Sequence, residues 1–142
     1  MAKRIKGLAT VTNALKKKGA AIEQGVKDQL LLAAKNISKD AYENRPSGDI
    51  RIFDFPSDSG LTQFVEASSQ SDVKLAAYME FGTGSGYKAI EASLEPEARE
   101  LARQFFVNGK GRLPARPYLL PAYYKHRKQF LVNIRKLVKK IV

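Results

Sequence analysis

A single helical pattern near the N-terminus constrains the fold more than any other feature of the chain. Apolar residues recur there at steps of three, four and seven, so a helix would align them in one stripe. The stripe consists of Leu15, Ile22, Val26, Leu30, Ala33 or Ala34, Ile37 and Ala41. Thr12 is a candidate N-cap, and Arg45 before Pro46 predicts a helix end near Asn44. Such a helix is roughly 45 Å long. We therefore expect the chain's own sheet to cover most of the stripe and a neighbouring subunit to cover the rest.

Three further segments have the pattern of short β-strands. Residues 50–55 and 61–68 flank a turn cluster at 56–60. Residues 73–81 alternate between apolar and more polar positions and stop at Gly82, as a half-buried strand would. The pattern predicts an antiparallel sheet of three to four strands.

The second half of the chain predicts two helices joined by a rigid connection. Residues 95–106 fit a short helix, with acidic residues leading and arginines trailing. Residues 114–122 contain three prolines. Pro114 and Pro117 favour extended neighbours, and Pro121 suits the first turn of a helix over 121–141.

Residues 82–92 connect the predicted third strand to the short helix. They carry three glycines within five residues, which invites comparison with a phosphate-binding loop. The Lys-Ser/Thr ending of such loops is missing, and no helix N-terminus is well placed to receive a phosphate. We expect this segment to be a loop that is mobile in the isolated subunit.

Two segments of this sequence together resemble a known family. The first signature is Leu-Ala-Ala-Tyr-Met-Glu-Phe-Gly-Thr at residues 75–83, and the second is Pro-Ala-Arg-Pro-Tyr-Leu-Leu-Pro-Ala at residues 114–122. They resemble the siphophage neck and tail-completion proteins, the HK-ninety-seven gene-product-ten-like family. The resemblance covers the body of the chain. It implies a structural protein of a tailed bacteriophage virion, made in the host cytoplasm.

In that family the expected assembly is a homo-oligomeric ring at the head–tail junction. Such a neck protein, also described as a head–tail connector, tail-completion or tail-terminator component, joins the head-closing ring to the tail and lets double-stranded DNA pass. Its partners would be adjacent neck, head-completion and tail proteins. We favour a hexamer, and a ring of twelve copies stays open.

The resemblance also directs attention to particular residues for the subunit interface. They lie in the two signatures and are Glu80, Phe81, Gly82, Thr83, Arg116, Pro117 and Tyr118. Arginine can bind a carboxylate in a bidentate way, so we expect Glu80 and Arg116 to pair, within one subunit or between two. The alternative is that both side chains are solvated.

The charges of the chain are unevenly distributed. Residues 1–100 hold 14 basic and 14 acidic side chains, so the net charge of +11 comes from residues 101–142, which hold 11 Lys and Arg and no acid. Residues 1–18 are also basic, with six cations and no acid, and residues 19–100 carry eight basic against 14 acidic residues. This asymmetry favours an anionic partner or the association of unlike surfaces.

The last predicted helix is amphipathic and has a basic outer face. Its apolar seam consists of Tyr123, Phe130, Ile134, Leu137 and Ile141, widened by Leu131 and Val138. The basic partner-docking face consists of Lys128, Arg135, Lys136, Lys139 and Lys140. It could contact DNA phosphates, dock on the acidic rim of an adjacent ring, or be solvated. A cationic channel wall would hold DNA, so we expect this face to meet neighbouring protein or solvent.

The sequence offers no set of residues for catalysis or metal binding. The chain has no cysteine, and its one histidine, His126, stands among cations, so we expect a surface side chain there. We predict no catalytic, cofactor-binding or metal residues, and a protein that is not an enzyme. No apolar run approaches the roughly 20 residues of a membrane helix, and the N-terminus lacks the apolar core of a secretory signal. We expect a soluble intracellular protein without a membrane partner.

These observations predict one α+β domain over residues 1–142. It has a basic flexible arm at 1–11, a long N-terminal helix, an antiparallel sheet of three to four strands, a short helix, and a C-terminal amphipathic helix packed on the sheet. The rival to the ring hypothesis is a small basic nucleic-acid-binding protein.

Overall fold

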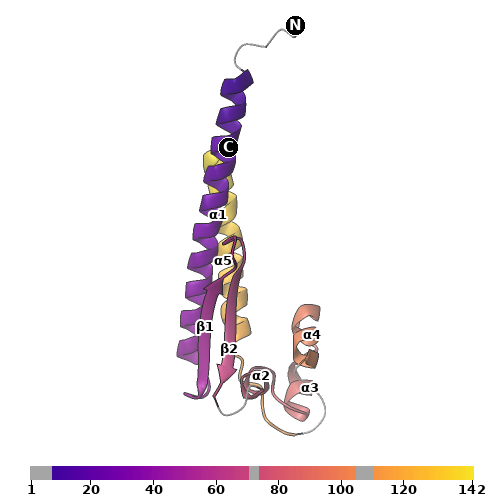
Figure 1. The fold of residues 1–142 in the computed structure, drawn as a ribbon. Helices are drawn as coiled ribbons and strands as arrows, with labels where there is room; N and C mark the ends of the chain where they lie inside the picture. The colour runs from indigo at the N-terminus through magenta and orange to yellow at the C-terminus, as the bar shows by residue number, and fades with distance from the viewer. Residues whose placement is uncertain (1–7, 71–73, 105–110) are drawn as a thin grey trace.

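The computed structural model describes residues 8–70, 74–104 and 111–142, which form an α+β fold (Figure 1). The elements in chain order are α1 (Leu8–Asn44), β1 (Ile50–Pro56), β2 (Gln63–Ser69), α2 (Leu75–Phe81), α3 (Ser85–Glu91), α4 (Pro96–Gln104) and α5 (Leu119–Ile141). The predicted fold class, the long N-terminal helix and its end at Asn44 are confirmed. Of the predicted arm at 1–11, residues 8–11 belong to α1 and the others lie outside the described residues.

Helices α1 and α5 form an antiparallel pair that is the spine of the molecule (Figure 1). Gly25 makes the close approach possible, because a Cβ at this position would lie 2.5 Å from a methyl carbon of Leu137. Farther along the pair, the amide of Asn133 donates a hydrogen bond to Gln29, with the nitrogen and oxygen 3.0 Å apart. The C-terminal helix was expected on the sheet. It packs mainly on α1 instead, and its first turns reach the hairpin.

Strands β1 and β2 pair antiparallel as one hairpin that lies over α1. Ile50 opposes Ser69 and Phe55 opposes Phe64, and Gly60 turns the chain with a φ of 73°. Ile50 and Ile52 face the helices, whereas Phe53 and Phe55 point outward and are nearly half exposed. The two predicted strands at 50–55 and 61–68 are thus confirmed.

The predicted third strand is wrong, because residues 75–81 form helix α2. Among the described residues the sheet therefore has two strands and not three or four. Leu, Ala, Met and Glu are good helix formers, and seven residues are too few to separate a period of 2 from one of 3.6. The buried positions are Ala76, Ala77, Glu80 and Phe81, which is the spacing of one helix face. The loop expected at 82–92 is also mostly helical, as α3.

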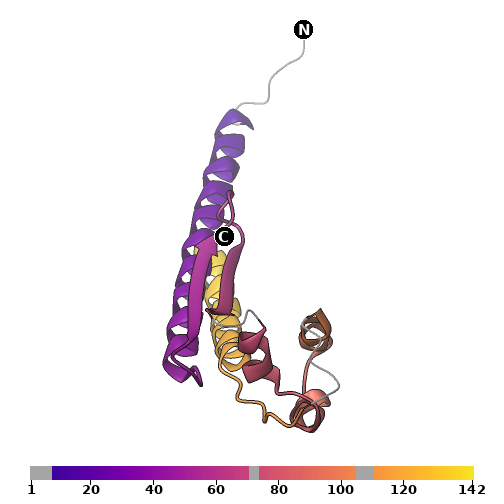
Figure 2. The same cartoon turned by 60° about the horizontal axis from the view of Figure 1, so that its bottom comes forward.

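Helices α2, α3 and α4 form a smaller unit at the end of the spine where α5 begins, and α4 stands away from the helix pair (Figure 2). Two small clusters make up the core. The arm cluster consists of Ala77, Phe81, Tyr87, Ala98 and Ala102. The body cluster consists of Ile37, Ala41, Ile50, Tyr118 and Ala122. Tyr118, from the second signature, lies in the body cluster, and Phe81, from the first, lies in the arm cluster.

Candidate functional site

The two signatures lie side by side in space, although about 30 residues of chain separate them. The backbone N–H of Thr83 donates to the carbonyl of Leu113 at 2.9 Å, and the Leu113 N–H donates to the Thr83 hydroxyl at 3.1 Å. Three residues on, the Arg116 N–H donates to the carbonyl of Met79 at 2.8 Å. We call this region the signature junction. It fixes the direction in which the chain enters α5.

Glu80 is the centre of the signature junction, where its carboxylate caps the N-terminus of α5. One oxygen, Oε2, accepts the backbone N–H groups of Tyr118 at 2.8 Å and Leu119 at 2.9 Å. The other, Oε1, accepts the N–H of Leu120 at 2.8 Å. The first N–H groups of a helix have no partner within it, and negative charge is favourable at that end. An acidic residue in the middle of one signature therefore satisfies the start of the helix that follows the other.

Glu80 is only 4% exposed, and this burial raises the pKa of its carboxyl group above the ordinary value. The three N–H donors act in the opposite direction and offset part of that effect. Beside it, Tyr118 is 2% exposed and its hydroxyl donates to the carbonyl of Ala76 at 2.9 Å. Burial, and then the charge of Glu80, raises the pKa of the Tyr118 hydroxyl. Glu80 and Tyr118 thus form one buried polar unit with the backbone of both signatures.

The glycines of the first signature and the residues after it allow the proline-rich segment to lie directly against them. Gly82 has a φ of 74° and Gly84 a φ of 52°, both in the region that favours glycine. A Cβ at Gly84 would collide with the carbonyl of Gly111, and one at Gly86 with the carbonyl of Leu113. The glycines serve close packing of two chain segments, so their number is no sign of a free loop.

The predicted interface residues divide into two groups. Glu80, Phe81, Gly82 and Tyr118 are buried within the chain's own fold, and Thr83 is half-buried against Leu113. Two other members, Arg116 and Pro117, are exposed. They line a polar hollow of about 570 Å³ between the end of α1 and the start of α5. They are the members of the set most available to a neighbouring subunit.

The expected pairing of Glu80 with Arg116 does not form within the subunit. The carboxylate of Glu80 is occupied by three backbone donors, and the Arg116 side chain makes no ion pair with any described residue. A sequence pattern can indicate that two residues belong to one site. It does not indicate whether their side chains or their backbone atoms make the contacts there. Arg116 contributes its backbone N–H to the signature junction, and the residue lines the polar hollow.

His126 is not the solvated surface residue that we expected. Its ring is 14% exposed, and Nε2 lies 2.6 Å from Oδ2 of Asp40 on α1. Lys125 also approaches Asp40, at 3.4 Å. The hydrogen bond from His126 is the main reason why the pKa of Asp40 is lowered. Asp40 is 86 residues away in sequence, so only the antiparallel pairing of α1 with α5 brings the two together.

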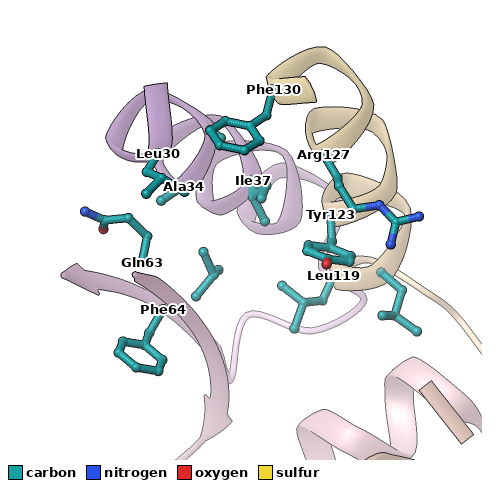
Figure 3. Close-up of a pocket in the computed structure, with 12 residues that line it drawn as sticks. Leu30, Ala34, Ile37, Gln63, Phe64, Leu119, Tyr123, Arg127 and Phe130 are labelled. Atoms are coloured by element: carbon teal, nitrogen blue, oxygen red, sulfur yellow. The ribbon is translucent and has the colours of Figure 1, made fainter. Parts of the chain in front are cut away.

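An apolar groove opens between α1, β2 and the first half of α5, with a volume of about 460 Å³ (Figure 3). Leu30, Ala34 and Ile37 line it from α1, and Tyr123 and Phe130 line it from α5. On the strand side it is lined by Gln63, Phe64 and Val65. The side-chain oxygen of Gln63 is buried without a hydrogen-bond partner. The groove lies between β2 and the first half of α5.

The predicted basic partner-docking face is exposed along its whole length. Lys128, Arg135, Lys136, Lys139 and Lys140 are all exposed, and none forms an ion pair with a described residue. Of the predicted seam on α5, Leu131 and Val138 stay exposed at 47% and 38%. The helix is amphipathic as predicted, and part of its apolar side has no cover within the described chain.

No group of three or more His, Asp or Glu side chains in the described ranges is arranged to hold a metal ion. The described helices include none that is long and apolar enough to cross a membrane. No protein-family model, characterised protein or solved structure matches this chain.

Proposed function

We propose that this chain is a structural, non-enzymatic protein of a tailed bacteriophage. It forms a ring, most simply of six copies, at the head–tail junction of the virion, joins the head-closing ring to the tail and lets DNA pass. Two observations support this proposal. The signatures that resemble the neck and tail-completion family form one buried unit, and the subunit leaves much of its apolar surface open.

The uncovered apolar surface is the observation that carries the proposal. Seven of the twelve buried hydrophobic residues are alanines, so few large side chains stabilise the subunit alone. By contrast, fourteen large hydrophobic residues in the described ranges are exposed. Most of them occur on α1, on the outer face of the hairpin and on α5, and Leu101 lies on α4. Extended apolar surface on a soluble protein marks an interaction site. Closed rings of identical subunits cover such surfaces with unlike surfaces of the next copy.

The outer face of the hairpin is the clearest part of that surface. The rings of Phe55 and Phe64 stack with their centroids 5.1 Å apart, and both are more than 40% exposed. Phe53 follows on the same face of β1. These three side chains contact solvent on the side of the sheet that faces away from α1.

A size measurement tests the proposal. We expect the purified protein to form a discrete multimer in light scattering after gel filtration, alone or on addition of its neck partners. Phe53→Ser with Phe64→Ser should reduce assembly while the subunit keeps its far-ultraviolet circular dichroism. A control is Leu101→Ser, which changes an exposed hydrophobic residue on α4 instead of the hairpin. A wild-type monomer that stays monomeric with every candidate partner contradicts the proposal.

A second function, that of a small basic nucleic-acid-binding protein, is favoured by the exposed cations of α5. This second function predicts a monomer or dimer that binds duplex DNA, with an affinity that falls steeply as the salt concentration increases. Changing Lys136, Lys139 and Lys140 to Glu distinguishes the nucleic-acid-binding function from the neck function. Loss of tight, salt-sensitive DNA binding with intact head–tail joining supports the nucleic-acid function. Loss of docking to an adjacent ring supports the neck function.

A further inference from the structure

The two basic parts of the sequence meet at one end of the molecule. Because α1 and α5 are antiparallel and Leu137 lies against Gly25, the last turns of α5 lie beside the N-terminal half of α1 (Figure 1). The cations there are Lys16, Lys17 and Lys18 from α1 and Arg135, Lys136, Lys139 and Lys140 from α5. We call these seven residues the basic tip. All seven are exposed.

No acid of the described residues forms an ion pair with the basic tip. Residues 13–20 and 134–142 contain no acid. Two acids of α1, Glu23 and Asp28, lie at the level of the last turns of α5, but Glu23 is 3.3 Å from Lys27 in an ion pair and Asp28 accepts a hydrogen bond from Gln24. None of the seven cations pairs with a described residue. A group of exposed cations without paired acids creates a positive potential that attracts an anionic partner.

Exposed aliphatic side chains are neighbours of these cations in sequence on both helices. Leu15 on α1 is 65% exposed, and Val138 on α5 is 38% exposed. A DNA backbone gains nothing from covering such groups, because it presents phosphates and sugars without large apolar surface. The described part of the tip has no aromatic side chain that could stack on a base. A protein surface that carries both carboxylates and aliphatic groups matches cations and aliphatics together.

We propose that the basic tip, built from both helices, is the docking surface for an acidic protein surface that also presents aliphatic side chains. This inference extends the docking face of the proposed function and rests on it. It adds Lys16, Lys17 and Lys18 of α1 to the docking face. It also requires apolar contacts as well as charge pairing for the partner to bind. The N-terminal half of α1, whose residues 13–20 are all exposed, gains cover when the partner binds.

The proposal is tested by measuring the binding of a labelled helical peptide made of Glu and Leu. Two other probes are compared with it. They are a Glu-Ser peptide of equal charge and a 24-base-pair DNA duplex. We expect the Glu-Leu peptide to bind most tightly at 150 mM salt. The triple change of Lys16, Lys17 and Lys18 to Glu should weaken its binding about tenfold or more, as should the triple change at Lys136, Lys139 and Lys140. The charge-matched control reverses Lys39, Lys88 and Arg112, which are exposed elsewhere, and should change binding less than about threefold.

The apolar contribution is measured with Leu15→Ser and Val138→Ser combined. This variant should weaken binding of the Glu-Leu peptide about tenfold and leave duplex binding unchanged. The inference is overturned if the duplex or the Glu-Ser peptide binds as tightly as the Glu-Leu peptide. It is also overturned if only the α5 triple change matters, or if anionic lipid vesicles bind and the Glu-Leu peptide does not. If rings form while the tip fails these tests, the inference falls and the proposed function stands. If the tip binds as expected but no ring ever forms, the proposed function falls.

Discussion

Removing the carboxylate of Glu80 should destabilise the subunit more than any change of a surface acid. Glu80→Ala leaves the N–H groups of Tyr118, Leu119 and Leu120 without their acceptor. A buried donor without a partner costs about 1–3 kcal/mol, and loss of a helix cap costs about 0.5–2 kcal/mol. Leu119 and Leu120 are only half-buried and recover part of their hydrogen bonding from water. We therefore expect a loss of about 3–5 kcal/mol, a large share of the roughly 5–15 kcal/mol that stabilises a domain.

Urea unfolding followed by circular dichroism measures this loss. Glu66→Ala is the matched control, because Glu66 is exposed on β2 and should change stability by less than about 0.5 kcal/mol. Glu80→Gln keeps one carbonyl oxygen as an acceptor and should lose about half as much as Glu80→Ala. If Glu80→Ala unfolds at the same urea concentration as Glu66→Ala, Glu80 does not support α5 and the signature junction is misassigned.

The raised pKa of Glu80 makes the stability of the folded state depend on pH in a defined direction. Burial raises the pKa of Glu80 in the folded state, so the folded state prefers the protonated form more than the unfolded state does. The part of the Glu80 contribution that depends on proton binding is therefore complete below its ordinary pKa and is lost as pH rises through the raised value, whereas the part from its three hydrogen bonds is separate. The difference in stability between wild type and Glu80→Gln should increase as pH falls from 7 towards about 4.5. A difference that stays constant or shrinks over this range refutes the argument.

Three further predictions concern single residues. Gly86→Ala should destabilise the subunit by about 2 kcal/mol or more, because its methyl group would meet the carbonyl of Leu113, whereas Gly48→Ala, in open space, should be nearly neutral by the same urea assay. His126→Phe should raise the pKa of Asp40 towards its ordinary value in a carbon-detected NMR titration, and an unchanged Asp40 titration would show that the histidine contact is not formed. Arg116→Ala should impair ring assembly more than it lowers the melting temperature, and the opposite result would assign Arg116 to the fold.

The elements with long periodic patterns could be predicted from the sequence. The stripe from Leu15 to Ala41 indicated α1, and the alternation around the turn cluster indicated the β1–β2 hairpin. The prolines before α5 marked its start to within two residues. In α1 enough residues repeat the pattern to separate a helix from a strand, and in the hairpin the turn cluster between two β-branched and aromatic segments supplies the missing evidence.

The signature junction could be predicted only in part. The two signatures marked the right segments, but a seven-residue stretch such as α2 fits both periodicities, and the sequence favoured the wrong one. The cap that Glu80 provides, and the contact of His126 with Asp40, join residues 38 to 86 positions apart. The close packing of Gly86 against Leu113 is likewise a contact between distant segments. Such contacts depend on how the chain folds back, and no local pattern encodes them.

Electron microscopy of phage particles that contain this protein, labelled with an antibody to it, tests the central claim most directly. The antibody should be raised against the exposed end of α4, outside the surfaces proposed for assembly. The account predicts label at one place on each particle, between the head and the tail. Label over the capsid or along the tail, or complete particles with no label, would contradict it.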